Sequence, residues 1–122
     1  MAIGFEKLSG TEPVYSQLVR QVKDRIASGR LSSGDPLPSR RELAAELGIN
    51  PNTVQKAYKL LEDEGLVATM QSSHSVVTAS PEAVEELRRS SAADCAREFS
   101  ARMKELGFDF RETVGVLGDS WE

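Results

Sequence analysis

Apolar residues recur at helical spacing in five stretches of this chain, and glycine, proline and helix-capping residues separate the stretches. The first stretch predicts a helix between Pro13 and Gly29, with an apolar residue at every fourth position from Val14 to Ile26. The expected polar side of this helix carries three basic residues: Arg20, Lys23 and Arg25. Residues 1–10 have a mixed pattern, which predicts at most an ordered arm or strand.

Residues 37–65 predict two helices joined by a tight turn. Ser39 and the Glu three residues later form a capping box at the start of the first helix, and Gly48 ends that helix. Asn50 followed by Pro51 is typical of a helix start, because Asn caps free N–H groups and Pro has none to satisfy. The second helix keeps a polar, partly basic face exposed, which indicates a helix-turn-helix motif.

The segments that flank this motif predict a connector and a hairpin. Residues 30–38 contain a glycine and two prolines, so they are expected to be non-helical. Residues 66–70 and 75–78 favour β-strands around a four-residue turn, 71–74, which is the pattern of a wing. Two short strands are not stable alone and must pack against the helices.

The C-terminal third predicts two more helices. The first begins at Pro81 and ends before Gly107, so it has about 25 residues and a length of roughly 40 Å. Asp109 opens a short last helix with a second capping box. The predicted fold is therefore mainly α with a small β-hairpin: a winged helix-turn-helix domain in residues 1–79 and a two-helix dimerisation module in residues 80–122.

The long helix carries an apolar stripe that outreaches the small first domain, and the last helix has an apolar side of its own. Exposed apolar patches of this size mark interaction surfaces. A symmetric homodimer is expected, because it pairs two reading helices with a palindromic DNA site. The expected dimer interface consists of Leu87, Ser91, Cys95, Phe99, Met103, Leu106, Phe110, Leu117 and Trp121.

The composition bears on the size of the domain, on the cellular compartment and on the distribution of charge along the chain. The 122 residues suit one small domain with an appendage, and no run reaches the roughly 18 apolar residues of a membrane helix. The N-terminus lacks a signal-peptide pattern and the single cysteine cannot form an internal disulfide, so a cytoplasmic protein is expected. The net charge is −4; Lys and Arg balance Asp and Glu in residues 1–79, and the acidic excess lies in residues 80–122. This balance permits DNA binding but does not argue for it.

Catalytic and metal chemistry are not expected. One His and one Cys in different modules cannot form a zinc site, and no catalytic triad pattern or glycine-rich phosphate loop occurs. Acidic pairs such as Glu85 and Glu86 lie on a predicted helix surface. No enzyme activity, catalytic residue, metal or cofactor is therefore predicted.

Several linked motifs of the first domain occur in the order found in one known family. Residues 34–44 read Gly-Asp-Pro-Leu-Pro-Ser-Arg-Arg-Glu-Leu-Ala, and Asn-Pro-Asn-Thr-Val-Gln-Lys-Ala-Tyr and Leu-Glu-Asp-Glu-Gly-Leu-Val follow. Across about residues 11–79 the chain resembles the GntR family of bacterial transcription regulators, and its short tail resembles the YtrA-type branch. The resemblance implies a dimeric winged-helix repressor, and YtrA-type members often control ABC-transporter operons.

The resemblance also implies which residues contact DNA. Arg41 matches a position that contacts phosphates, and Arg40 lies beside it. Three polar residues at the start of the second helix match positions that approach base edges; amides pair with adenine, and Thr contacts thymine. Two lysines further along suit phosphates, whereas the alternative is an ordinary solvated helix face. The contacts expected from this helix are Asn52, Thr53, Gln55, Lys56 and Lys59.

Two features depart from the family pattern. Many relatives have Arg at the positions of Pro51 and Gln55, so this reading helix is based on amides rather than arginines. The wing segment from Met70 to Ser75 has neither glycine nor Lys or Arg. His74 is the one candidate contact there, and a merely solvated His is the alternative. A single domain is therefore expected to bind weakly or with strong salt dependence, and affinity is expected to depend on dimerisation.

These patterns predict a sequence-specific transcriptional regulator that binds a palindromic double-stranded operator as a homodimer. The family resemblance implies that it is a repressor and that a transporter operon is its target. A small-molecule effector would act between subunits or between modules, and no membrane partner is expected. The alternative is a winged-helix adaptor that has lost DNA binding, which the serine-rich wing and the acidic net charge favour.

Overall fold

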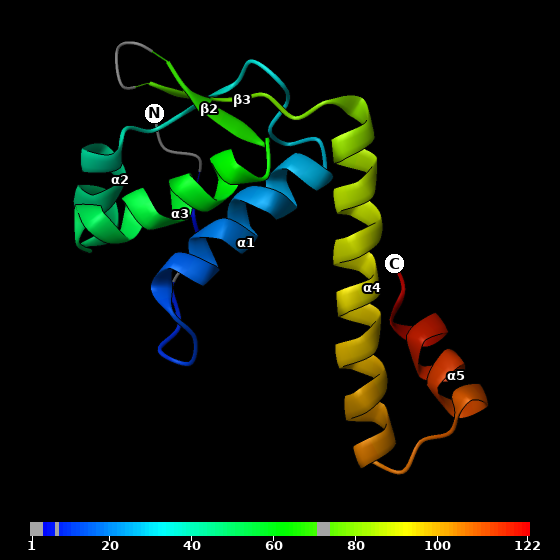
Figure 1. Cartoon of the computed structure of the whole chain (residues 1–122). Helices are drawn as coiled ribbons and strands as arrows, with labels where there is room; N and C mark the ends of the chain where they lie inside the picture. The colour runs from blue at the N-terminus through cyan, green and yellow to red at the C-terminus, as the bar shows by residue number, and fades with distance from the viewer. Residues whose placement is uncertain (1–3, 7, 71–73) are drawn as a thin grey trace. The chain divides into compact units, whose positions relative to one another are not determined.

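The structure of the chain, a computed structural model, describes residues 4–6, 8–70 and 74–122. Its elements in chain order are α1 (Val14–Ala27), β1 (Pro36–Leu37), α2 (Arg40–Leu47), α3 (Pro51–Asp63), β2 (Val67–Thr69), β3 (Ser75–Val77), α4 (Pro81–Glu105) and α5 (Phe110–Ser120) (Figure 1). They form two compact units, Met1–Arg88 and Arg89–Glu122, so the division falls inside α4 and later than residue 79. The predicted class, mainly α with a small β element, is confirmed.

Three helices enclose the core of the first unit. The apolar side predicted for α1 is buried, and it packs against α3, which also contacts α2. Large apolar side chains that are fully buried in these helices are Leu18, Val22, Ile26, Leu43, Val54 and Leu61. Complete burial of each such side chain stabilises the fold by about 1.5–3 kcal/mol, so this cluster is the main reason why the unit folds.

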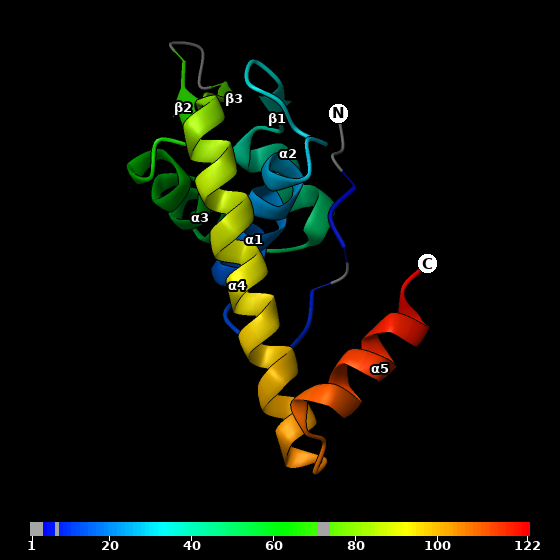
Figure 2. The ribbon, with the colours of Figure 1, turned by 90° about the vertical axis from the view of Figure 1, so that its right-hand side faces the viewer.

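The sheet has three strands in the order β1-β3-β2, all antiparallel, and β2 and β3 lie above α3 in Figures 1 and 2. The predicted hairpin is present as β2 and β3, where Val67 pairs with Val77. The sequence did not predict β1, because two residues inside a proline-containing connector have no strand pattern. Pro36 pairs with Val76 at the edge of the sheet, where a strand tolerates the missing N–H of proline.

The predicted helix starts of the motif are confirmed. Ser39 accepts a hydrogen bond from the Glu42 N–H at 3.1 Å, and Glu42 accepts one from the Ser39 N–H at 3.0 Å. The Ser39 backbone and then its hydroxyl lower the pKa of Glu42, so this cap weakens as the pH falls through that pKa. Asn50 caps α3 by accepting from the Asn52 N–H at 2.8 Å. Gly48 ends α2 at a φ of +67°, which glycine adopts without a steric penalty.

A segment before α1 is held against that helix by polar side chains. Gln17 accepts a hydrogen bond from the Ser9 N–H at 2.7 Å, and Gln21 accepts one from the Glu6 N–H at 2.8 Å. Arg25 donates to the Gly4 carbonyl and lies 5.1 Å from the centre of the Phe5 ring. The three side chains share one side of α1, and all are buried: Gln17, Gln21 and Arg25.

The expectation that Arg25 belongs to the exposed polar side of α1 is therefore wrong. The side chain of Arg25 is 5% exposed, because the N-terminal segment covers that side of the helix. A buried cation needs partners, and the neighbouring backbone carbonyls supply them, including that of Gln21 at 3.0 Å. The described part of residues 1–10 contains no strand, and hydrogen bonds to Gln17, Gln21 and Arg25 hold it against α1.

The C-terminal helices also begin as predicted. Ser80 caps α4 by accepting from the Ala83 N–H at 3.1 Å, and Asp109 forms a capping box at the start of α5. Within the first unit, the beginning of α4 packs on the core through Ala83, Val84 and Leu87. None of the helices in the described ranges is long and apolar enough to cross a membrane.

Tyr58 on α3 gives a test of how the motif is held. Its buried hydroxyl donates to the Pro38 carbonyl at 2.7 Å. We expect Tyr58→Phe to lower the free energy of unfolding by about 1–3 kcal/mol, since the buried carbonyl then lacks a donor. Urea unfolding followed by circular dichroism would measure this. Tyr15→Phe is the matched control, because the Tyr15 hydroxyl has no hydrogen-bond partner among the described residues. Equal stability of the two variants would contradict the role given to this bond.

Candidate nucleic-acid interface

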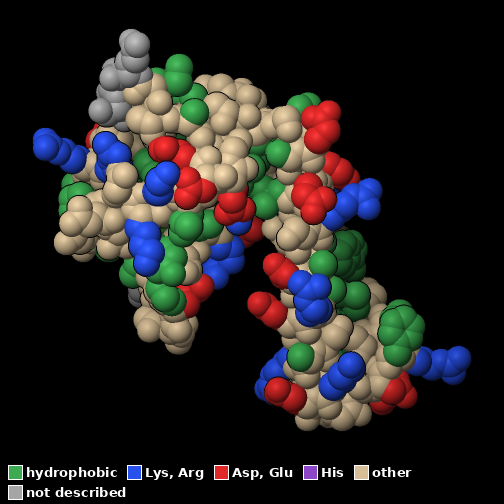
Figure 3. All heavy atoms as spheres, in the orientation of Figure 1, with side chains coloured by type: hydrophobic (Ala, Val, Ile, Leu, Met, Phe, Trp, Pro, Cys, Tyr) green, Lys and Arg blue, Asp and Glu red, His purple; other side chains and the backbone are tan. Residues whose placement is uncertain are grey.

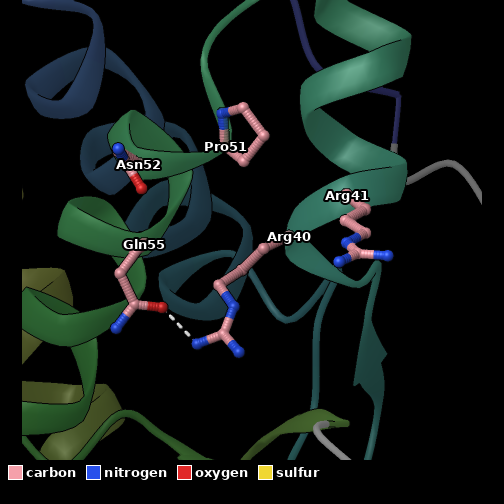
Figure 4. Close-up of a pocket in the computed structure, with 5 residues that line it drawn as sticks. All are labelled: Arg40, Arg41, Pro51, Asn52 and Gln55. Atoms are coloured by element: carbon pink, nitrogen blue, oxygen red, sulfur yellow. Dashed lines mark hydrogen bonds between the residues drawn. The ribbon is translucent and has the colours of Figure 1, made fainter.

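The first turns of α2 and α3 form an open hollow of about 430 Å³. It is lined by Arg40, Arg41, Pro51, Asn52 and Gln55, and Figure 4 shows these residues from the two helices around it. Ser39 caps the start of α2 and Asn50 caps the start of α3, and the two helices pack against each other. The structure thus brings together four of the predicted contact residues, and we call this feature the α2–α3 hollow.

Arg40 and Gln55 join the two helices across the hollow. The guanidinium Nη1 of Arg40 donates a hydrogen bond to the side-chain oxygen Oε1 of Gln55, drawn as a dashed line in Figure 4. The sequence predicted both residues as contacts but not this link, because they are 15 positions apart. The link orients both side chains before any partner is bound.

Arg41 differs from its neighbour. In Figure 4 its side chain extends from α2 apart from the Arg40–Gln55 pair. It makes no hydrogen bond or ion pair with any residue that the structure describes. Its guanidinium is therefore available to an anion. The two adjacent arginines, which the sequence could not tell apart, have different environments.

The remaining predicted residues of α3 do not line the hollow. Thr53 is half-buried. Lys56 places its ammonium 3.8 Å from the centre of the Tyr15 ring, a cation–π contact that stabilises by about 0.5–1 kcal/mol at exposed sites. Lys59 forms an ion pair with Asp63 at 2.9 Å, and the hydrogen bond to Asp63 raises the pKa of Lys59. Both lysines are thus engaged within the chain, although both side chains are exposed.

Tyr15 is a residue that the sequence analysis missed as a neighbour of this surface. It lies in the first turn of α1, and its ring supports Lys56 of α3. An aromatic residue near the start of an amphipathic helix has no spacing signal that separates it from a core residue. Only the packing of α1 on α3 brings the two side chains together.

The wing contributes less to the described surface. His74 is exposed, does not line the hollow, and accepts a backbone hydrogen bond from the Met70 N–H at 2.6 Å at the base of the hairpin. Residues 71–73 of the predicted turn lie outside the described residues. The role of His74 as a contact stays a prediction.

Charge on the first unit is mixed. On the face that Figure 3 shows, blue basic and red acidic side chains are interspersed over this unit. Ion pairs account for part of this pattern, including Lys23 with Glu64 at 2.9 Å and Arg20 with Glu12. This agrees with the charge balance of residues 1–79. The α2–α3 hollow therefore offers a binding partner oriented hydrogen-bond donors rather than a dense patch of positive charge.

No group of three or more potential metal ligands occurs among the described residues. The single cysteine, Cys95, is exposed and free. The described surface therefore offers hydrogen bonding and charge, and no arrangement for nucleophilic or metal chemistry is apparent on it.

Comparisons with known proteins agree with this geometry. The family model "Bacterial regulatory proteins, gntR family" matches residues 14–77. The HTH-type transcriptional regulator YhcF of Bacillus subtilis, which is described as uncharacterised, is 33% identical over 88% of this chain and 89% of its own length. The HTH-type transcriptional repressor YtrA of Bacillus subtilis is 49% identical over 48% of this chain, but the match spans only 45% of YtrA.

A solved structure is similar across almost the whole chain. It is a GntR family transcriptional regulator from Listeria monocytogenes, with a TM-score of 0.83, 28% identity, and coverage of 93% of this chain and 100% of that one. The family and these relatives are transcription regulators and not enzymes. The extent of these matches and the helix-turn-helix geometry show that the chain belongs to the GntR family of bacterial transcription regulators and is of the YtrA type.

Proposed function

We propose that this regulator is a repressor that binds a palindromic DNA operator as a homodimer in the cytoplasm. The observation that carries the proposal is the α2–α3 hollow, where the exposed first turns of a helix-turn-helix present several hydrogen-bond donors together. In such motifs the second helix enters the major groove with its N-terminal residues at the base edges, and α3 has its polar residues at that end.

Each predicted contact has a role that fits its position. Arg41 has no partner in the described chain, so it is suited to a phosphate. Asn52 and Gln55 carry amides that can bond to base edges, and Thr53 lies between them in the first turn of α3. Lys56 and Lys59 are exposed and can turn to phosphates at the cost of their contacts with Tyr15 and Asp63. His74 would contact DNA from the base of the wing.

Unpartnered apolar side chains in the second unit support a dimer. Phe110, the first residue of α5, is 84% exposed, and Trp121, which directly follows α5, is 77% exposed. Green hydrophobic side chains gather on this unit in Figure 3. Ser91 of the expected interface is half-buried, and its other exposed members are Cys95, Phe99, Leu106 and Leu117. Two reading helices about 34 Å apart would then meet successive major grooves on one side of DNA.

Two residues expected at the dimer interface already have contacts within the chain. Leu87 packs against the core of the first unit, and Met103 is buried. Their contribution to a dimer would be indirect, through the position of the helix that carries them. Val114 and Val116, which the expected interface did not include, are exposed on α5 and extend the apolar surface.

The direction of regulation rests on similarity to the YtrA repressor, and a transporter operon is the target class that the YtrA type implies. A small effector would change regulation only if it bound one arrangement of the two reading helices more tightly than another. The alternative is a winged-helix adaptor without DNA binding, and the DNA titration described next distinguishes it from a regulator.

Arg41 tests the phosphate contact. A duplex selected by the wild-type protein from a randomised library would be titrated at two salt concentrations and followed by fluorescence anisotropy. We expect Arg41→Ala to weaken binding to all sequences by a similar factor and to reduce the salt slope by about one counterion. Arg30→Ala, on the turn after α1, is the charge-matched control and should leave the slope unchanged. If the wild-type protein retained no duplex at low salt, the adaptor would be the better description.

The α5 surface tests the dimer. We expect the wild-type protein to be a dimer at micromolar concentration and the Phe110→Ser/Leu117→Ser variant to be a monomer, because the variant loses apolar area that only a partner would bury. Light scattering would report the mass. Met70→Ser removes an exposed apolar side chain from the first unit and should remain dimeric. A monomeric wild type would contradict the proposal.

A further inference from the structure

We infer that Arg40 and Gln55 act as one composite reader that selects guanine over adenine at one position of each half-site. The inference rests on the DNA-binding function proposed above and adds the chemistry of recognition. Its starting point is the side-chain hydrogen bond that joins the first residue of α2 to the second turn of α3.

The direction of the Gln55 amide follows from the chemistry of its partner. A guanidinium has only hydrogen-bond donors, so the Gln55 atom that faces Arg40 must be the oxygen Oε1. In Figure 4 the amide nitrogen Nε2 of Gln55 points away from Arg40. Its two donors have no hydrogen-bond partner among the described residues. Arg40 keeps further N–H donors beyond the one used for this bond.

The paired side chains therefore offer donors and a positive charge. The acceptor that makes a free Gln suitable for adenine is already engaged by Arg40. Of the described residues that line the α2–α3 hollow, none carries a carboxylate that could offset the guanidinium charge. Asn52 lines the same hollow and retains an amide oxygen, so the restriction applies to the Arg40–Gln55 pair and not to the whole hollow.

The four bases present different groups to such a pair. Guanine offers two acceptors in the major groove, N7 and O6, which match two outward donors. Adenine offers one acceptor and the N6 donor, and cytosine offers a donor. The adenine donor or the cytosine donor would have to share the Gln55 oxygen with Arg40, and it would lie beside the positive charge of the guanidinium. Thymine has one acceptor and a methyl group, so it can satisfy only one of the donors.

The same geometry separates the roles of the two adjacent arginines. Arg41 has no partner in the described chain and is suited to phosphate, which sets affinity and salt dependence. Arg40 is drawn toward α3, so it is a specificity-determining residue and should contribute little to the salt slope. Loss of Arg40 should therefore change which base is preferred, whereas loss of Arg41 should weaken binding to all sequences.

The experiment is a selection of full-length protein on a randomised duplex library, followed by sequencing of the bound DNA. We expect the wild-type protein to prefer guanine at one position per half-site. Arg40→Met should change the guanine-to-adenine preference at that position by about tenfold or more in favour of adenine, since the Gln55 oxygen becomes free for adenine N6. The double variant Arg40→Met/Gln55→Met should lose the preference, and Arg30→Met is the control that should select the wild-type sequence.

Arg40→Lys is a second variant, which keeps the charge but lacks the planar fork, and it should reduce the guanine preference without changing the salt slope. Circular dichroism would show whether each variant folds. If the wild-type protein selects a sequence and both Arg40 variants select the same one, the composite reader is overturned while the proposed function stands. A uniform loss across all sequences with a smaller salt slope would also overturn it, because it would place Arg40 on phosphate. A wild-type protein that selects no sequence would overturn the proposed function itself.

Discussion

The hydrogen bond from Tyr58 to the Pro38 carbonyl connects the interior of α3 to the residue that precedes the cap of α2. Burial raises the pKa of the Tyr58 hydroxyl, so this group remains a protonated donor at ordinary pH. Ser39, the next residue, caps α2. The contact therefore lies directly before the helix turn that carries Arg40 and Arg41. This bond therefore links α3 to the chain just before α2, the two helices that supply the residues of the α2–α3 hollow.

Most cations near the reading helix are engaged within the chain. Lys56 lies over Tyr15, Lys59 pairs with Asp63, and Arg40 bonds to Gln55. Each contact is weak in water, but each favours one position of a long and otherwise mobile side chain. The surface therefore presents oriented groups rather than a diffuse positive field. This is the physical reason to expect that the proposed DNA affinity needs a second copy of the chain.

The N-terminal segment covers the polar side of α1, which the sequence suggested would face solvent. The helix is therefore buried both on this side and on the apolar side that packs against α3. Gln17, Gln21 and Arg25 bind the backbone of this segment and leave no buried side-chain polar atom of the described residues without a partner. Buried polar groups are costly unless they are satisfied, so the register between the segment and α1 is specific. The segment covers α1, and α1 in turn supports α3.

The sequence determined those features that depend on neighbours along the chain. The two capping boxes, the Asn50 cap, the glycine helix ends and the apolar sides of α1 and α3 all arise within a few residues, and all occur as predicted. The resemblance to the family implied Arg40, Arg41, Asn52 and Gln55 as contacts, and the structure places these four residues around one hollow. Only the tertiary structure decided the two-residue strand β1, the burial of Arg25 and the bond between Arg40 and Gln55. Each of these joins residues from separate elements, and a hydrogen bond across such a distance leaves no periodic pattern in the sequence.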